Sequence, residues 1–421
     1  MTPQNGSQAD FDRLMRQWFE ADGQGREPEH LLGSVLDRTS RTWHRPGWLL
    51  LERWLPMQLT MRAPAVPRLV PLTLLLIALL VAAALAIVYV GSHRVPPPFG
   101  PAANGLIAYD DNAAIYVANA DGSNGRVVAR ASPYASAPTF SPDGKRIAFW
   151  GEDRPDSLFL VDADGSNLKR LAGDLWIETN HPPSWSPDGR SIAFSTESGP
   201  DRGDARAYVV DVAGGPPRLV GGGGPRNVNA YFPSWSPDGE WIAFVGVEGT
   251  AGARLWIVRP SGNDAHALAS TPNLTVDQPQ WDPSGTALRI TYAASPSTSD
   301  PGLHDIYVFD VRSDRELALS HETADEYLPA WSPDGTRLAW LVGDHPSTVH
   351  VDTIDGAGDA KSLATGVFEG PVSWSPDGTL ILGQSPNNAA VSVVSVDGSA
   401  PIVRIQHARG QGPPAQQRLA P

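Results

Sequence analysis

Six copies of one short motif constrain the fold of this chain more than any other feature. In each copy an aromatic residue precedes a Ser-Pro-Asp-Gly turn, or a close variant of it, and a run of β-forming residues follows. Proline fixes φ and glycine accepts φ > 0, so the turn reverses the chain between two strands. The copies lie about 40 to 50 residues apart, which is the period of one propeller blade. Their aromatic residues are Phe140, Trp185, Trp235, Trp281, Trp331 and Trp374.

A second repeat, a strand–turn–strand unit, alternates with the first. Seven copies begin at Ile115, Leu158, Ala207, Leu255, Ile306, Val349 and Val391. The turn that would complete a seventh pair has a degenerate counterpart at Asn104-Gly105, in the segment that starts at Pro98. Residues 98–408 are therefore predicted to be all-β and to form a seven-bladed β-propeller. Six blades is the alternative, if the first or last unit is incomplete and the two ends share strands. Either array must close, because open edge strands invite aggregation.

The alternation of P-x-W-S-P-D-G turns with I-Y-V-x-D-x-D-G hairpins resembles the TolB-type, WD-like propeller family. The resemblance covers about three quarters of the chain and implies the propeller fold. Members of such families serve as periplasmic interaction partners, as gating domains of serine peptidases and as sensor modules, so the resemblance implies a fold more than a function. The N-terminal part of the chain departs from soluble periplasmic TolB, which carries a different N-terminal domain.

An apolar segment, residues 69–90, predicts one membrane-spanning helix. It holds 22 residues without a charge, and a helix of that length covers about 33 Å, enough to cross a bilayer core. Arg53, Arg62 and Arg68 precede it closely, whereas only Arg94 follows closely. The positive-inside rule then puts the N-terminus in the cytoplasm and the propeller outside, in the plasma or inner membrane. With 68 residues ahead of it, the segment is expected to be an uncleaved signal-anchor.

The segment before the span, residues 1–60, is too short for a robust core of its own. Apolar residues recur at helical spacing over 9–21, and a second short helix is expected from Glu29 to about Thr39. Residues 43–57 combine tryptophan and arginine with an apolar stripe, which favours a helix in the lipid headgroup layer. The alternative is that these tryptophans pack on the first two helices. The predicted membrane-interface residues are Trp43, Arg45, Trp48, Arg53, Trp54, Arg62 and Arg68. Residues 91–97 are expected to be a linker, and the Gly/Pro/Gln-rich residues 409–421 a disordered tail.

Charge and missing motifs exclude several functions. Residues 95–421 hold 22 basic and 38 acidic residues, a difference of -16, so a nucleic-acid partner is not expected. The chain has no cysteine, which excludes disulfides and thiolate metal sites. No hydrolase elbow, zinc-protease helix, P-loop or dinucleotide fingerprint occurs, so no catalytic residue, metal or cofactor is predicted. Asp162 and Asp164 begin like a calcium loop, but no closing glutamate follows, and they are expected to stabilise a turn.

Binding residues are expected in the loops before each inner strand, because these loops converge on one mouth of the central channel. Aromatic and acidic groups there would suit a cationic or peptide ligand. The competing interpretation is that these loops are polar only because they are exposed. The candidates are Tyr134, Trp176, Glu178, Asn180, His181, Asn229, Tyr231, Asp277, Glu326, Tyr327 and Glu369.

Two functions are compatible with this layout. The first is a non-catalytic, membrane-anchored module that binds a protein or ligand outside the cytoplasm. The second is an anti-sigma-like regulator in which residues 9–40 hold a cytoplasmic transcription factor while the propeller senses a signal.

Overall fold

The computed structural model describes residues 101–419, apart from 153–155, 174, 180, 198–203, 223–227, 250–251, 269–274, 296–302, 321–323, 344–345, 356–360, 387–389, 400–401 and 407–412. The chain divides into two compact units, Met1–Val88 and Tyr89–Pro421, and only the second contains described residues. The predictions for residues 1–60, 69–90 and 91–97, including every membrane-interface residue, lie outside the described part. Within that part, no helix is long and apolar enough to cross a membrane.

The named elements of the described residues are all β-strands, which confirms the all-β prediction for this unit. One sheet has seven strands in the order β27-β1-β2-β3-β4-β5-β6. In that order the strands are Ala415–Leu419, Ala103–Asp110, Asn112–Ala118, Arg126–Phe140, Arg146–Glu152, Asp156–Asp162 and Lys169–Ala172.

Five further sheets have four antiparallel strands each and follow one another along the chain. The first of these five contains β7 (Ser184–Trp185), β8 (Ser191–Ser195), β9 (Ala207–Asp211) and β10 (Arg218–Gly221). The next contains β11 (Val228–Trp235), β12 (Ile242–Glu248), β13 (Ala253–Val258) and β14 (His266–Ala267). It is followed by β15 (Thr275–Trp281), β16 (Arg289–Ser295), β17 (Asp305–Asp310) and β18 (Arg315–Ala318). The last two contain β19 (Glu326–Trp331), β20 (Arg337–Val342), β21 (Ser347–Thr353) and β22 (Lys361–Phe368), then β23 (Val372–Trp374), β24 (Leu380–Gln384), β25 (Ala390–Ser395) and β26 (Val403–Gln406).

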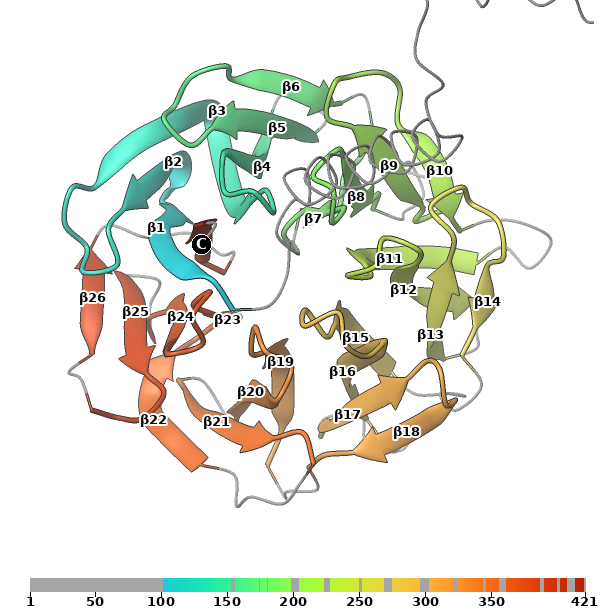
Figure 1. The fold of residues 1–421 in the computed structure, drawn as a ribbon. Coiled ribbons are helices and arrows are strands. Elements are labelled where there is room, and N and C mark those ends of the chain that lie inside the picture. Colours follow the sequence, from blue (N-terminus) through green and yellow to red (C-terminus); the bar gives the residue numbers. More distant parts are fainter. Residues whose placement is uncertain are drawn as a thin grey trace, which may run out of the picture. The chain divides into compact units, whose positions relative to one another are not determined.

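The sheets stand around a ring, with the first strand of each four-stranded sheet facing its centre (Figure 1). The seven-stranded sheet consists of two such units that share β3. The first half of β3 pairs with β2, from Val117↔Arg126 to Ala114↔Arg130. The second half of β3 pairs with β4, from Ala135↔Gly151 to Phe140↔Ile147. One long strand therefore serves as the outer strand of one unit and the inner strand of the next.

The C-terminal strand β27 closes the ring. It pairs antiparallel with β1, from Ala103↔Leu419 to Ala108↔Ala415, and so supplies the inner strand of the first unit. The prediction of a disordered tail over 409–421 is wrong for Ala415–Leu419, because the free edge of β1 offers these residues a template for backbone pairing. The β-sheet region accordingly extends beyond the predicted limit at residue 408.

Side chains reinforce this closure. Gln417 donates from Nε2 to the Gly144 carbonyl (2.7 Å), and its Oε1 accepts from the Leu106 amide (3.1 Å). Ser373 donates to the Pro414 carbonyl (2.6 Å). The closing segment is therefore bonded to the units on both of its sides.

Each Ser-Pro-Asp-Gly turn is held by its own side chains. In the first, Ser141 donates to Asp143 Oδ1 (2.6 Å), which also accepts from the Lys145 amide (3.1 Å), and Gly144 adopts φ 70°. Four more copies repeat the serine–aspartate bond, at Ser186–Asp188, Ser236–Asp238, Ser332–Asp334 and Ser375–Asp377. Burial alone would raise the pKa of Asp334, but hydrogen bonds from Ser332 and Thr336 outweigh it and hold this pKa below its usual value. The repeated aspartates therefore stabilise turns, as the sequence predicts.

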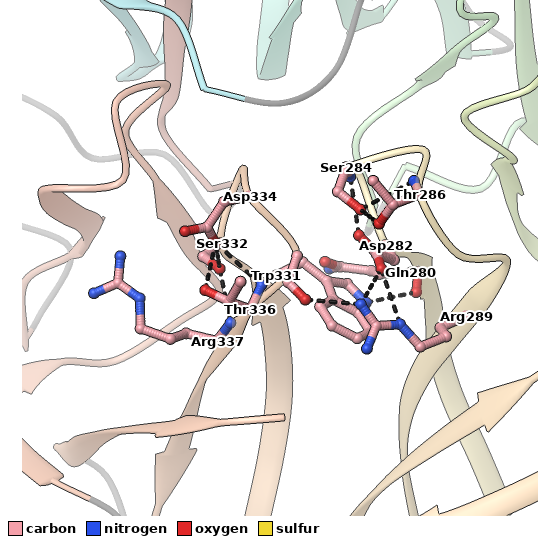
Figure 2. A network of polar contacts seen from close by, with 11 residues as sticks. Gln280, Asp282, Ser284, Thr286, Arg289, Trp331, Ser332, Asp334, Thr336 and Arg337 are labelled. Carbon is pink, nitrogen blue, oxygen red and sulfur yellow. Dashed lines mark hydrogen bonds and ion pairs between the residues drawn. The ribbon is translucent and has the colours of Figure 1, made fainter. Parts of the chain in front are cut away.

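Tryptophan and arginine join neighbouring sheets (Figure 2). Arg289 pairs with the buried Asp282, donates from Nη2 to the Gly335 carbonyl of the next sheet (2.8 Å) and lies 5.0 Å from the centre of the Trp331 ring. Trp331 donates in return from Nε1 to the Gln280 carbonyl (3.1 Å). The Arg289–Asp282 pair lies within one sheet, whereas the contacts with Gly335, Trp331 and Gln280 cross the boundary between two sheets. The motif tryptophan therefore has a structural role in the ring.

The same device recurs around the ring. Arg146 and Arg337 donate to the Gly189 and Gly378 carbonyls (3.0 Å each). Trp185, Trp281 and Trp374 donate to carbonyls of the preceding unit, those of Thr139 (3.3 Å), Ser234 (2.9 Å) and Ala330 (2.9 Å). Trp235 breaks the pattern, because its Nε1 has no hydrogen-bond partner among the described residues. In the preceding sheet, the equivalent strand β8 begins with Ser191, whereas β4, β16 and β20 begin with arginine.

Replacing Arg337 with methionine tests how strongly one such arginine contact stabilises the boundary between two sheets. The substitution keeps the apolar stem but removes the bond to the Gly378 carbonyl and the contact of the guanidinium with the Trp374 ring, 4.8 Å away. We expect the free energy of unfolding to fall by about 1 to 3 kcal/mol, measured by urea denaturation followed through tryptophan fluorescence. Arg404→Met, at an exposed position of β26, is the matched control and should change it by less than about 0.5 kcal/mol. Equal effects of the two substitutions would contradict a stabilising role of the Arg337 contacts.

Candidate functional site at one mouth of the ring

The inner strands carry a repeated backbone irregularity next to the predicted binding loops. Ala137, Phe232 and Leu328 adopt φ of 51°, 54° and 54°, and each directly precedes the proline of its motif. Strand pairing shifts register at all three places. Such bulges re-aim the side chains around them and are costly for residues other than glycine.

Side chains of the preceding unit of the ring hold two of these bulges in place. The Ala137 amide donates to Asp110 Oδ2 (3.2 Å), and the Phe232 amide donates to Ser195 Oγ (3.3 Å). Burial raises the pKa of Asp110 from 3.8 to about 7, although backbone hydrogen bonds from Asn112 and Ala137 act in the opposite direction. Two of the loops are thus anchored at their bases by a side chain of the preceding unit.

Glu178 and His181 come together, because both line one cavity of about 390 Å³ between the inner strands. The His181 ring lies 3.7 Å from the Phe232 ring, and its carbonyl accepts from Trp150 Nε1 (2.6 Å). Both ring nitrogens are buried and have no hydrogen-bond partner among the residues that the structure describes. Burial therefore lowers the pKa of His181 from 6.5 to about 3, so the imidazole is neutral at physiological pH.

Trp176 and Tyr134 behave differently within the same loops. Trp176 is 46% exposed, the highest exposure of any tryptophan in the described part of the chain. Tyr134 packs against a hydrophobic cluster and accepts a bond from Ser136 Oγ (2.5 Å); burial raises its pKa. Of the two, Trp176 is the one that exposes a large apolar surface.

Glu326 and Tyr327 do not line an open mouth. Glu326 is fully buried and accepts from Trp340 Nε1 (2.8 Å). The Tyr327 hydroxyl donates to the Gly343 carbonyl (3.2 Å) and contacts the hydroxyl of Ser347. Both residues brace the end of β19, so the interpretation of Glu326 as an exposed binding acid is corrected: its partner is a tryptophan of the adjacent strand.

The other candidates are scattered around the ring. Asn229 accepts the Ala205 amide on its side-chain oxygen (2.9 Å), Tyr231 lies 5.8 Å from the Phe232 ring, and the Glu369 amide donates to the Gln384 carbonyl (3.0 Å). Asn180 and the side chain of Asp277 lie outside the described residues. The structure therefore places Glu178 and His181 at one cavity, whereas the Asn229 side chain accepts a hydrogen bond from the backbone of Ala205.

Two features were missed by the sequence reasoning. His304 Nδ1 lies 2.8 Å from Asp325 Oδ1, which also accepts the His304 amide (2.9 Å). The two residues are 21 positions apart, and no motif joins them. Arg418 lines the same cavity as Glu178 and His181, but it belongs to the segment that was predicted to be disordered. Among the described residues, no three His, Asp or Glu side chains are placed to hold a metal ion.

Four-stranded antiparallel units around a ring, joined by a closing C-terminal strand, define a β-propeller. Residues 95–297 match a family model described as the TolB beta propeller domain. Over residues 95–297 the propeller therefore matches the TolB-type β-propeller family.

Individual relatives match more narrowly. The Tol-Pal system protein TolB of Thioalkalivibrio sulfidiphilus is 38% identical over 60 residues, which is 14% of this chain and 14% of that protein. An oligogalacturonate lyase from Vibrio parahaemolyticus superposes with a TM-score of 0.52 at 14% identity, covering 72% of this chain and 92% of the lyase. A puromycin-hydrolyzing peptidase of Mycobacterium tuberculosis gives a TM-score of 0.52 at 14% identity, covering 73% of this chain and 56% of the peptidase. At these identities the two enzymes share the fold alone.

Proposed function

We propose that this chain is a non-catalytic, membrane-anchored binding module of the cell envelope, with a seven-bladed propeller that binds a protein outside the cytoplasm. The TolB-type propeller supports a protein-binding role, since the named relative belongs to the Tol-Pal system. The two units that share β3, together with the five further sheets, support seven blades. The apolar residues 69–90 and the arginines before them support the anchor and its orientation.

The observation that carries the proposal is the exposure of Trp176 beside Glu178, in a loop whose backbone is fixed. The Glu178 amide donates to the Ser195 carbonyl (2.8 Å), and the Glu197 amide donates to the Trp176 carbonyl (2.7 Å). A large aromatic side chain on a rigid backbone loses little conformational entropy on binding, which is why tryptophan is enriched among residues that dominate interfaces.

Affinity capture of the full-length protein from its own membranes tests this role. We expect Trp176→Ala to weaken recovery of a specific partner about tenfold or more, as loss of an interface tryptophan commonly does. Leu317→Ala, at an exposed position on the outer strand β18 (49% exposed), should recover that partner normally. An unchanged set of partners with Trp176→Ala would contradict a binding site at this mouth.

The same capture with residues 1–60 deleted tests the anti-sigma-like alternative. A cytoplasmic partner lost on this deletion but kept by Trp176→Ala would support a regulator that acts through residues 9–40. Recovery of the same partners with and without residues 1–60 would leave the propeller as the binding part.

A further inference from the structure

The centre of the ring contains two adjoining cavities, the first with a mixed polar and apolar wall and the second with a mainly apolar one. Each has a volume of about 390 Å³, within the range of sites for small ligands. They share the lining residues Thr139, Gln280, Trp281, Pro283 and Arg418 among others. Prolines and tryptophans of the repeated motifs form the apolar part of both walls, and Glu178 and His181 also line the first cavity.

Among the described residues that line the second cavity, Arg418 is the one with a charged side chain, and it lines the first cavity as well. It lies on β27, the strand that closes the ring. Burial lowers the pKa of Arg418, which shows that its guanidinium has lost part of its hydration. A guanidinium stays charged in a protein and, beside apolar walls, interacts strongly with an oxyanion in the planar geometry that its donors match.

A second polar group lies two residues earlier on the same strand. Gln416 lines the first cavity and donates from Nε2 to the Gly105 carbonyl (3.4 Å), while its buried Oε1 has no hydrogen-bond partner in the part of the chain that the structure describes. An unsatisfied buried acceptor costs free energy that a ligand with an N–H or O–H group can recover. The closing strand thus brings one cation and one unsatisfied acceptor to the cavities.

We infer that the central cavities bind a monocarboxylate with an apolar body, with its carboxylate on Arg418. A carboxylate is favoured over a phosphate because residues 95–421 have a formal charge of -16, which repels an anion in proportion to its charge. The apolar body matches the proline and tryptophan walls. The carboxylate can belong to a free acid or to the C-terminal end of an apolar peptide. This inference does not depend on the protein-binding role of Trp176.

Calorimetric titration of the full-length protein in detergent tests the inference. The probes are 4-phenylbutyrate against 4-phenylbutyramide, and an acetylated apolar tetrapeptide with a free C-terminus against its amidated form. We expect at least one acid to bind about tenfold or more tightly than its amide, and Arg418→Gln to abolish that preference. Arg404→Gln, on an exposed residue of β26, should leave it unchanged. Preference for phenylbutyrate identifies a free acid as the source, and preference for the peptide acid identifies a C-terminus.

Arg418→Lys keeps the inference testable if Arg418→Gln disturbs ring closure. Lysine keeps the charge but loses the planar pair of donors, so about three- to tenfold weaker binding of the acid is expected, with an unfolding midpoint close to that of the parent protein. The inference is overturned if acids and amides bind alike, if none of the four probes binds up to about 10 mM, or if the folded Arg418 variants keep the full preference.

Discussion

Removal of residues 413–421 is expected to lower the thermal midpoint of the propeller by about 10 °C or more. The deletion takes away β27, which pairs with β1 from Ala103 to Ala108, and the bonds that Gln417 makes to Gly144 and Leu106. Several hydrogen bonds at about 1 kcal/mol each, together with lost packing, amount to about 5 kcal/mol. At about 2 to 4 °C per kcal/mol for a large domain, this corresponds to the stated shift.

The measurement is differential scanning calorimetry of the full-length and truncated proteins. Leu419→Ser is the control, because Leu419 is 41% exposed at the end of β27 and its replacement leaves the pairing intact. The truncated protein should also aggregate at lower concentration, since the inner edge of β1 becomes free. A truncated protein that melts within about 2 °C of the parent would show that β27 does not hold the ring together.

The repeated motifs predicted most of the propeller because each one carries its own turn chemistry. Ser141, Asp143 and Gly144 form a turn with bonds inside a six-residue window, so local sequence is enough to place it. The hairpins follow for the same reason: Asp162 and Asp164 accept bonds from Asn167 and Ser166, close by in sequence. Local interactions repeated at a constant spacing are the part of a fold that one sequence reveals best.

The closing strand could not be predicted in this way. Ala415–Leu419 reads AQQRL, without a β-branched or aromatic residue, and its intrinsic preference for strand is low. It becomes a strand because β1, more than 300 residues earlier in the chain, presents a free edge to it. The low strand propensity of this segment gives no sign that Arg418 lines a cavity. Arg418 reaches the cavities because β27 pairs with β1.

The candidate site shows the same limit. Glu326 is an acidic residue in a predicted loop, where an exposed side chain is expected. Its carboxylate is instead buried against the Trp340 indole. Trp340 lies on the adjacent strand β20, and only the register between the two strands brings the groups together. Position in a loop before an inner strand does not by itself separate an exposed residue such as Trp176 from a bracing residue such as Glu326.

The largest pH effect is expected to stay hidden until one of two opposing groups is removed. The folded state raises the pKa of Asp110 to about 7 and lowers that of His181 to about 3. The stability linked to Asp110 is fully present below its unfolded pKa of 3.8 and is lost as pH rises to about 7. The stability linked to His181 is present above its unfolded pKa of 6.5 and is lost as pH falls toward 3. Between pH 4.5 and 6.5 both groups act, each with a slope of about 1.4 kcal/mol per pH unit and opposite in sign.

Urea denaturation of three full-length proteins at pH 4.5, 5.5 and 6.5 separates the two groups. In His181→Phe only Asp110 remains of the pair, so the free energy of unfolding should fall with pH relative to the parent, by about 3 kcal/mol over the range. In Asp110→Asn only His181 remains, and the free energy should rise by a similar amount. Glu316, whose pKa burial also raises, is present in all three proteins and cancels in the differences. Parallel pH profiles for the parent and His181→Phe would contradict the lowered pKa of His181. In that case the imidazole would have a hydrogen-bond partner or contact with water in solution, and would not be buried and neutral beside Phe232.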